Sequence, residues 1–286
     1  MTPAQFTEWL SSPSRRPLVM GVLNVTPDSF SDGGLFQAVD AAVAHAEMMA
    51  AEGADIIDIG GESTRPGACR VPASEQIRRI EPVFRALAGR LPVVLSVDTT
   101  RAEVAAVALD HGAHIVNDIS AGRDDARMLP LIAARGCAVI LMHMKGQPAD
   151  MQIQPHYDDV VGEVKAFLLE RAAAARGAGV LPERILIDPG IGFGKRLEDN
   201  LLLLRELRQL AGTGHPVVVG TSRKSFIGHL TGETEPAERV FGTAASVAWT
   251  VAAGAAIVRV HDVGPMAKVV RVVHAIQLGR PPGRDG

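Results

Sequence analysis

Two residues near the C-terminal end of the chain have the spacing of an anion-binding pair. Arg259 and His261 lie two residues apart in the apolar stretch AAIVRVH, residues 255–261. Alternate residues of a strand point to the same side, so both side chains share one face while Val258 and Val260 take the other. Two groups able to carry positive charge, placed together, suit a phosphate or diphosphate. A lone strand arginine is more often a surface or ion-pair residue, but the nearby histidine favours anion binding.

Carboxylates and an amide end other apolar runs. Asp98 and Asp188 each close such a run, where a carboxylate can accept two ring N–H groups of a heterocycle and stabilise developing positive charge. The alternative is that each caps the next helix; near Asp98, Thr99 or Thr100 is the better cap, which leaves Asp98 free. Asn117 and the neighbouring Asp118 pose the same choice, and Asn117 has the end-of-strand position.

Asp58, inside the run DIIDIGG, is expected to lie within the fold in a polar network, without a catalytic role.

The stretch VVVGTSRKSFIG, residues 217–228, passes from an apolar run into small residues and then a lysine. Small residues such as Gly220 let a ligand approach the backbone closely. Lys224 has the reach to contact a ring carbonyl or a phosphate, although most loop lysines are simply solvated. Arg223 is interpreted as an ordinary loop residue.

The stretch ILIDPGIGFGK, residues 185–195, resembles a nucleotide-binding loop and fails the test. A P-loop requires glycine where Pro189 stands and Ser or Thr where Arg196 stands. The loop is better interpreted as wrapping a flat ligand, with Phe193 as an apolar wall. His111 and His114 have the spacing of a metal pair but lack a third ligand, so a structural role is favoured.

Eight short apolar or β-branched runs recur along the chain, separated by stretches with helical spacing. Regular alternation of strands and helices predicts parallel strands joined by helical crossovers, and eight such units fit a (β/α)8 TIM barrel in a single domain. A doubly wound open sheet is the alternative. The predicted divisions are an N-terminal segment at 1–17, the barrel at 18–279 and a tail at 280–286.

Each of the eight runs ends in a polar residue or a Gly-rich turn. In a barrel these ends converge on one mouth, where chemistry takes place. The first run, LVMGVLN, stops at Asn24, and the polar, turn-forming sequence TPDSFSDGG follows. The other run ends are Gly60-Gly61-Glu62, Asp98, Asn117-Asp118, His143, Asp188, Ser222 and His261.

Composition excludes several classes of protein. The chain has 286 residues, 47% of them hydrophobic, and a net charge of −3, which argues against nucleic-acid binding. Its two cysteines, Cys69 and Cys137, are typical of a reducing compartment. The N-terminus lacks the order of a signal peptide, and no apolar run approaches the roughly 20 residues that span a bilayer. We therefore expect a cytoplasmic protein without membrane partners.

Taken together, the motifs resemble those of the dihydropteroate synthase family, the folate-pathway enzymes inhibited by sulfonamides. The resemblance covers residues 18 to 263 and rests on all the motifs occurring in order: NVTPDSFSDGG, DIGGESTRPGA, SVDT, IVNDIS, LMHMKG, DPGIGFGK, GTSRKSFIG and RVHDV. It implies a barrel, a homodimer and transferase activity. The implied reaction joins 4-aminobenzoate to (7,8-dihydropterin-6-yl)methyl diphosphate, giving 7,8-dihydropteroate and diphosphate.

The resemblance also implies a role for individual residues. Asp98, Lys224 and Arg259 would be catalytic, and Asn24 would contact Mg²⁺ held by the diphosphate. The pterin diphosphate would be bound by Thr64, Arg65, Asp98, Asn117, Asp188, Lys224, Arg259 and His261. The 4-aminobenzoate pocket would be formed by Phe30, Pro66, Phe193, Ser222 and Lys224.

Three other activities are compatible with parts of this pattern. A folate-dependent methyltransferase would share the pterin-binding barrel, but we would not expect it to need STRPGA or TSRKSFIG. A non-catalytic relative kept as a binding module is disfavoured by the intact motifs. A barrel enzyme acting on another phosphorylated metabolite would require the whole motif set to be coincidental.

Overall fold

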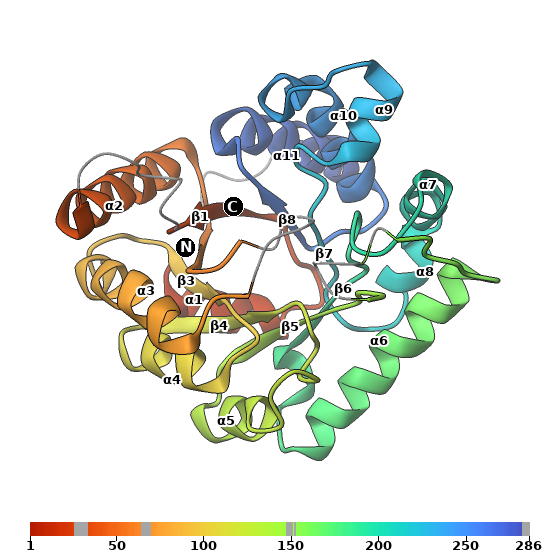
Figure 1. Ribbon diagram of the computed structural model, residues 1–286. Helices are drawn as coiled ribbons and strands as arrows, with labels where there is room; N and C mark the ends of the chain where they lie inside the picture. The colour runs from red at the N-terminus through yellow and green to blue at the C-terminus, as the bar shows by residue number, and fades with distance from the viewer. Residues whose placement is uncertain (26–33, 64–69, 147–150, 152, 282–286) are drawn as a thin grey trace.

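The computed structural model describes the whole chain except residues 26–33, 64–69, 147–150, 152 and 282–286. Eight parallel strands form its centre, hydrogen-bonded in the order β6-β5-β4-β3-β2-β1-β8-β7. A parallel bridge between Ile187 and Val217 joins β6 to β7 and closes the ring. Figure 1 shows the strands inside a ring of helices. The strands are β1 Leu18–Asn24, β2 Ile56–Gly60, β3 Val94–Asp98, β4 Ala113–Asp118, β5 Ala138–Met142, β6 Ile185–Asp188, β7 Val218–Val219 and β8 Ile257–Val260.

The predicted TIM barrel is therefore confirmed, and the open doubly wound sheet is excluded. Helices follow the strands around the outside. The longest helix of the described residues is α2, with 19 residues, one more than α6. The helices are α1 Pro3–Ser11, α2 Gly34–Glu52, α3 Ala73–Leu87, α4 Ala102–Asp110, α5 Met128–Arg135, α6 Val160–Gly177, α7 Leu197–Arg205, α8 Leu207–Ala211, α9 Ser225–Thr231, α10 Val240–Ala252 and α11 Val263–Leu278, with 3-10 turns η2 Pro182–Arg184 and η3 Pro236–Arg239.

Helix α2 illustrates how spacing produces an outer helix. Val43, Ala46 and Met49 are all buried against the barrel, as residues three apart on one helix face should be. The helix stops before Gly53, whose φ of 106° lies in the left-handed region that glycine adopts without strain.

Side chains inside the barrel change character from bottom to top. The lower inward-facing positions are apolar and form one core cluster, which includes Met20, Ile56, Val94, Ile115, Ile140, Leu186 and Ile257. Two residues further along several strands, on the same face, stand Asp58, Ser96, Asn117, Asp188 and Arg259. The barrel therefore has an apolar lower interior and a polar upper one.

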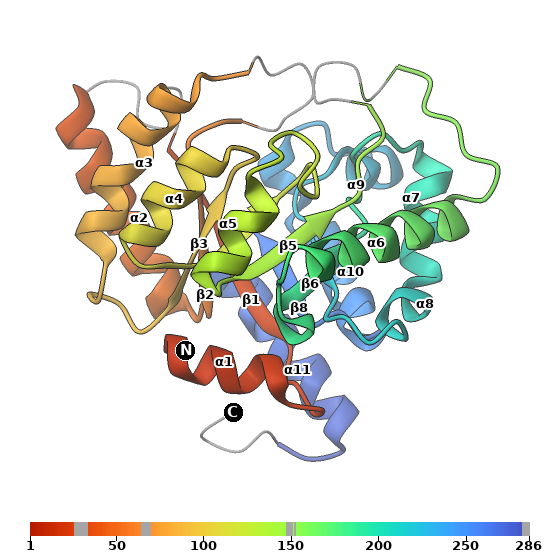
Figure 2. The same ribbon diagram turned by 90° about the horizontal axis from the view of Figure 1, so that it is seen from below.

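Helix α1 closes the bottom of the barrel. Thr2 and Gln5 form a capping box at its start, with Pro3 at the first helical position. Phe6 and Trp9 stack with ring centroids 5.6 Å apart and belong, with Leu10, to the lower apolar cluster. Figure 2 shows α1 lying across the bottom of the strands. The N-terminal segment thus packs on the barrel and supplies part of its core.

Among the helices of the described residues, none combines the length and the apolar character that a bilayer crossing needs.

Candidate functional site

A cavity opens at the C-terminal ends of the strands, and most of the predicted ring-binding residues meet there. Asp98, Asn117, Asp188, Lys224 and Arg259 all line it, with the predicted wall residue Phe193. The lining also includes residues that sequence reasoning did not assign: Ile119, Met142, Gly190 and Ile191. Ile119, Met142 and Phe193 belong to one buried apolar cluster beside the cavity. Met142 ends β5 and is paired in register with Asp188, a signal that could have identified it.

Arg259 joins two carboxylates below the cavity. Its Nε donates to Asp58 Oδ2 at 2.7 Å, and its Nη2 donates to Asp98 Oδ2 at 2.8 Å. Its side chain is only 20% exposed, so this charge is held in place within the barrel interior. Arg259 therefore forms ion pairs, and the anion binding favoured from the sequence stays a prediction. The other guanidinium nitrogen, Nη1, has no protein partner among the described residues, which leaves it available to an anion.

The two predicted ring-facing carboxylates are buried, which makes them hard to ionise. Burial raises the pKa of Asp98 to about 7, against the opposing effect of Arg259, and the charges of Asp58 and Glu62 add to the rise. Burial likewise raises the pKa of Asp188 to about 6, although the Gly190 N–H donates to its carboxylate at 2.7 Å. Both groups can change charge near neutral pH.

Lys224 lies over the ring of Phe193, with its Nζ 3.9 Å from the ring centroid. Burial, together with Arg259, lowers the pKa of Lys224 to about 8, so it is mainly charged at neutral pH. The free space in the cavity is only about 30 Å³, far below the roughly 150 Å³ of a protein cavity that holds a benzene ring. A bicyclic ring therefore requires Lys224 or its neighbours to move.

The ring of His261 carries less positive charge than its position beside Arg259 in the sequence predicted. Its Nδ1 lies 3.1 Å from Ser222 Oγ, and its backbone N–H donates to the same hydroxyl. Burial, reinforced by Arg259 and Arg223, lowers the pKa of His261 to about 3. The neutral ring offers a hydrogen bond to an anion, and the positive charge comes from Arg259 and Lys224.

The loop after β6 is held by a buried lysine that sequence reasoning left without a role. Lys195 is 3% exposed, and its Nζ donates to the carbonyl oxygens of Gly190 and Phe193, each at 2.9 Å, and of His143 at 3.3 Å. It also lies 3.0 Å from His143 Nδ1. Burial lowers the pKa of His143 to about 2, so the neutral ring accepts from the lysine.

Gly190 is required where this loop passes β5. Its φ is 66°, and a Cβ there would lie 2.0 Å from the carbonyl oxygen of His143. No other residue fits this close approach without moving the backbone.

Asn24 ends β1 and is paired in register with Gly60 of β2. Gly60 is in turn paired in register with Asp98 of β3. The half-buried side chain of Asn24 thus lies on the same rim as the cavity. The described residues contain no cluster of three or more His, Cys, Asp or Glu that could hold a metal unaided. One amide can still serve Mg²⁺, which keeps several waters and is usually held largely by substrate phosphates. The remaining predicted site residues, Phe30, Thr64, Arg65 and Pro66, lie outside the described residues.

Contacts from other elements decide the local predictions made for the start of α4, for Arg223 and for His111. The cap predicted at Thr99 or Thr100 is wrong: helix α4 has no side-chain cap of its own, and Asp125 accepts from the Ala102 N–H at 3.0 Å. Arg223 forms two hydrogen bonds with Asp262, at 3.0 and 2.6 Å, which tie the β7 loop to the start of α11.

His111 lies 3.4 Å from Glu81 and does not pair with His114, in keeping with a structural role.

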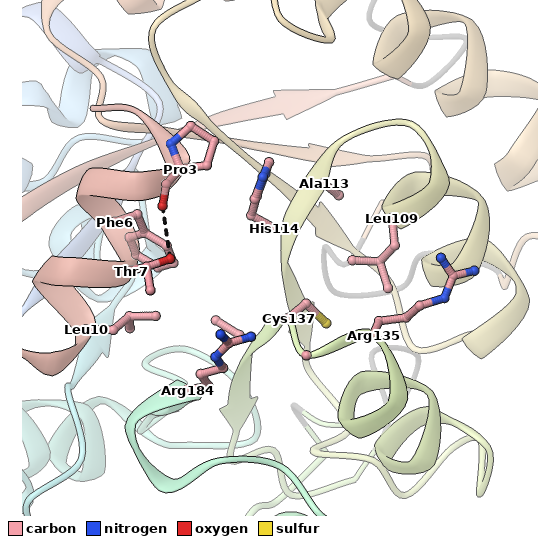
Figure 3. Close-up of a pocket in the computed structure, with 12 residues that line it drawn as sticks. Pro3, Phe6, Thr7, Leu10, Leu109, Ala113, His114, Arg135, Cys137 and Arg184 are labelled. Carbon is pink, nitrogen blue, oxygen red and sulfur yellow. Dashed lines mark hydrogen bonds between the residues drawn. The ribbon is translucent and has the colours of Figure 1, made fainter.

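A separate cavity of about 200 Å³ lies at the opposite end of the barrel. Figure 3 shows Phe6, Thr7 and Leu10 of α1 on one side of it and His114, Cys137 and Arg184 on the other. Burial raises the pKa of the Cys137 thiol to about 11, so it is not a reactive nucleophile. Because none of the strand-end groups faces this cavity, the mouth remains the candidate active site.

Known proteins share this arrangement. The family model described as "Pterin binding enzyme" matches residues 20–261. A dihydropteroate synthase from Synechocystis sp. is 48% identical over 262 residues, covering 92% of this chain and 91% of that protein. A solved Xanthomonas albilineans dihydropteroate synthase with 4-aminobenzoic acid has a TM-score of 0.86 and 49% identity, covering 92% of this chain and 93% of its own.

Another structure of that Xanthomonas enzyme, in complex with 7,8-dihydropteroate, has a TM-score of 0.83 and 46% identity, covering 92% of this chain and 94% of its own. A family model that spans most of the barrel and relatives close to half identical over nearly full length agree with the strand-end geometry. The chain belongs to the dihydropteroate synthases, within the family of pterin-binding enzymes.

Proposed function

We propose that this chain condenses (7,8-dihydropterin-6-yl)methyl diphosphate with 4-aminobenzoate, releasing diphosphate and forming 7,8-dihydropteroate for folate biosynthesis. The observation that carries the proposal is the meeting of Asp98, Asn117, Asp188, Lys224 and Arg259 in one cavity at the barrel mouth. Carboxylates and an amide suit the N–H-rich edge of a pterin, and the cations suit its carbonyl and its diphosphate tail. The relatives solved with 4-aminobenzoic acid and 7,8-dihydropteroate support the same choice.

The ring and the tail of the first substrate would be held by different groups. Asp98, Asn117 and Asp188 would bind the ring edge, and Lys224 its carbonyl. Arg259 would bind the diphosphate through Nη1, the guanidinium nitrogen that bonds to neither Asp58 nor Asp98. The neutral His261 would donate a further hydrogen bond to the diphosphate. Thr64 and Arg65 remain proposed diphosphate ligands from the sequence.

The chemistry needs no strong nucleophile from the protein. The bond between the methylene carbon and the diphosphate oxygen breaks, its electron pair leaves with the diphosphate, and a cation-like pterin forms. The amine lone pair of 4-aminobenzoate then forms the new C–N bond, and the nitrogen loses a proton. Asp98, when ionised, would stabilise the positive charge on the ring, and Arg259 the negative charge on the leaving group.

Mg²⁺ is proposed as the cofactor, carried by the diphosphate and contacted by Asn24. When bound, it neutralises charge on the leaving group. The single amide at the end of β1 suits a metal whose other ligands are phosphate oxygens and water.

The aminobenzoate would lie beside Phe193, Ser222 and Lys224, with Phe30 and Pro66 proposed from the sequence. Phe193 offers an apolar face and Lys224 a charge for the carboxylate. Because Lys224 now rests on the Phe193 ring, the pocket would form only when that contact opens. This supports binding of the pterin diphosphate before the aminobenzoate.

One assay tests the function directly. The purified protein is incubated with the pterin diphosphate, Mg²⁺ and radiolabelled 4-aminobenzoate, and labelled dihydropteroate and released diphosphate are measured together. Equal amounts of both products are expected. Diphosphate release without label in the pterin product would show hydrolysis instead, and no release at all would refute the proposal.

We also propose that the active form is a homodimer joined through the face made by α9, α10 and α11. Large apolar side chains are exposed there: Phe241 is 86% exposed, Ile276 73% and Trp249 55%. An apolar face of this kind is typical of a protein interface. Phe241→Asp should give monomers by light scattering, whereas Leu181→Asp, at an exposed position outside this face, should leave the dimer intact. A wild-type monomer would refute this assembly.

The compartment remains a proposal from the sequence. Few cysteines in a long chain are typical of proteins that work in a reducing cytosol.

A further inference from the structure

Asp58 lies in β2 below the cavity, and it contacts residues of three other strands. It is completely buried and is not among the residues that line the cavity. Its Oδ1 accepts from Ser96 Oγ in β3 at 2.6 Å. Its Oδ2 accepts from Asn117 Nδ2 in β4 at 2.9 Å and from Arg259 Nε in β8 at 2.7 Å. One carboxylate thus fixes two residues that do line the cavity.

The first of these is Asn117. An ionised carboxylate can only accept hydrogen bonds, so the Asn117 amide must turn its nitrogen toward Asp58. That choice leaves the amide oxygen and the second N–H for the cavity. The reverse orientation would set the amide oxygen against the carboxylate. Asp58 therefore determines which atoms Asn117 presents to a ring.

The second is Arg259. A guanidinium normally meets one carboxylate with two parallel N–H groups. Here the pair is divided, with Nε on Asp58 and Nη2 on Asp98. This division leaves Nη1 without a partner among the residues that the structure describes, and it prevents Arg259 from binding both oxygens of Asp98. Without Asp58, Arg259 would be expected to take both oxygens of Asp98 and turn Nη1 away from the tail.

We propose that Asp58 is a positioning residue of the pterin diphosphate site, which orients the Asn117 amide toward the ring and directs Arg259 toward the diphosphate without touching the substrate. This rests on the proposed function. It predicts a selective defect, because the hydrogen bonds of Asp58 in the described part of the chain go to Ser96, Asn117 and Arg259, and Phe193 and Ser222 are not among its partners.

The central test is Asp58→Asn, which preserves volume and one acceptor while removing the charge. kcat/KM for the pterin diphosphate should fall by about 30-fold or more, and KM for aminobenzoate should stay within about twofold. The matched control is Ser96→Ala, which removes only the third contact of Asp58 and should stay within about threefold of wild type. An equal rise of both KM values, or equal defects in the two variants, would overturn the proposal.

A double-mutant cycle separates positioning from general loosening. Because Asp58 acts through Arg259 as well as through Asn117, adding Asp58→Asn to Arg259→Ala should cost clearly less than the about 30-fold that it costs in the wild-type protein. Independent, additive losses would contradict the proposal. If Asp58→Asn does not fold, Asp58→Glu keeps the charge but displaces it by one methylene. Loss of turnover would then support positioning, and full activity would refute it. A wild-type protein without synthase activity would instead refute the proposed function.

Discussion

Replacing the buried Lys195 by methionine tests how the loop that carries Phe193 is held. Methionine is an unbranched side chain only one atom shorter than lysine, but it donates no hydrogen bond. The Phe193 carbonyl would lose its lysine donor, and so would the carbonyl and the Nδ1 of His143. The Gly190 carbonyl still receives the Phe193 N–H at 3.0 Å. At about 1–3 kcal/mol for each of these three buried acceptors left unpaired, we expect a loss of at least about 3 kcal/mol in the free energy of unfolding.

This loss should depend on pH. Burial lowers the pKa of Lys195 to about 7, below its unfolded value of about 10.4. Between these two values the unfolded chain holds a proton that the folded chain has released, so the wild-type protein gains stability as pH rises. The gap between wild type and Lys195→Met should therefore widen by at most about 1.4 kcal/mol per pH unit, or about 2 kcal/mol from about pH 7.5 to about pH 9.

The assay is urea unfolding at several pH values, followed by far-UV circular dichroism. Lys268→Met serves as the control because Lys268 is exposed. The aminobenzoate KM of Lys195→Met should also rise, since Phe193 loses its support. Unfolding free energies that run parallel with pH would show that Lys195 keeps an ordinary pKa. A variant as stable as wild type, with the same KM, would refute the supporting role itself.

Three further predictions follow from the site. Asp98→Asn should lower turnover by about 10²-fold or more, because the charge that stabilises the cationic ring is lost; near-normal rates would assign Asp98 a structural role. Since the carboxylate is needed ionised and the pKa of Asp98 is raised to about 7, wild-type kcat/KM should fall as pH drops through about 7, and this step should vanish in the variant. Arg259→Ala should weaken pterin diphosphate binding, measured by calorimetry, far more than binding of the free pterin; equal losses would contradict the anion role. Aminobenzoate should bind weakly until diphosphate is added, and tight binding to the empty protein would contradict the opening of the Lys224–Phe193 contact.

Much of the barrel could be predicted because its signals are local. Runs of apolar and β-branched residues marked all eight strands, even β7, which forms only two residues of regular strand. Strand parity correctly placed Arg259 on the inner face, with Val258 and Val260 in the outer core. Their positions at the ends of apolar runs correctly predicted that Asp98, Asn117 and Asp188 meet at one mouth.

What could not be predicted depends on contacts between distant segments. The low pKa of His261 follows from burial, then from Arg259 two residues before it, and then from Arg223 on another loop, and neither the burial nor the approach of Arg223 is visible in the local sequence. Lys195 acts through backbone carbonyls that the fold brings close to it. Every residue has a backbone carbonyl, so the sequence does not indicate which ones a lysine will contact. The cap of α4 comes from Asp125, more than twenty residues beyond the helix start, so a search for a local cap chose Thr99 or Thr100 wrongly.

The position of helix α1 has a consequence for how substrates and products reach and leave the site. Because apolar strand side chains fill the lower barrel and Phe6, Trp9 and Leu10 of α1 pack against them, small molecules cannot pass through the barrel from one side to the other. Both reactants and both products must then enter and leave through the mouth of the barrel. The molecule that binds last blocks the exit of the molecule that bound first. The closed lower end of the barrel would therefore impose an order on the binding of reactants and the release of products. This order would not depend on which ligands the residues at the mouth prefer.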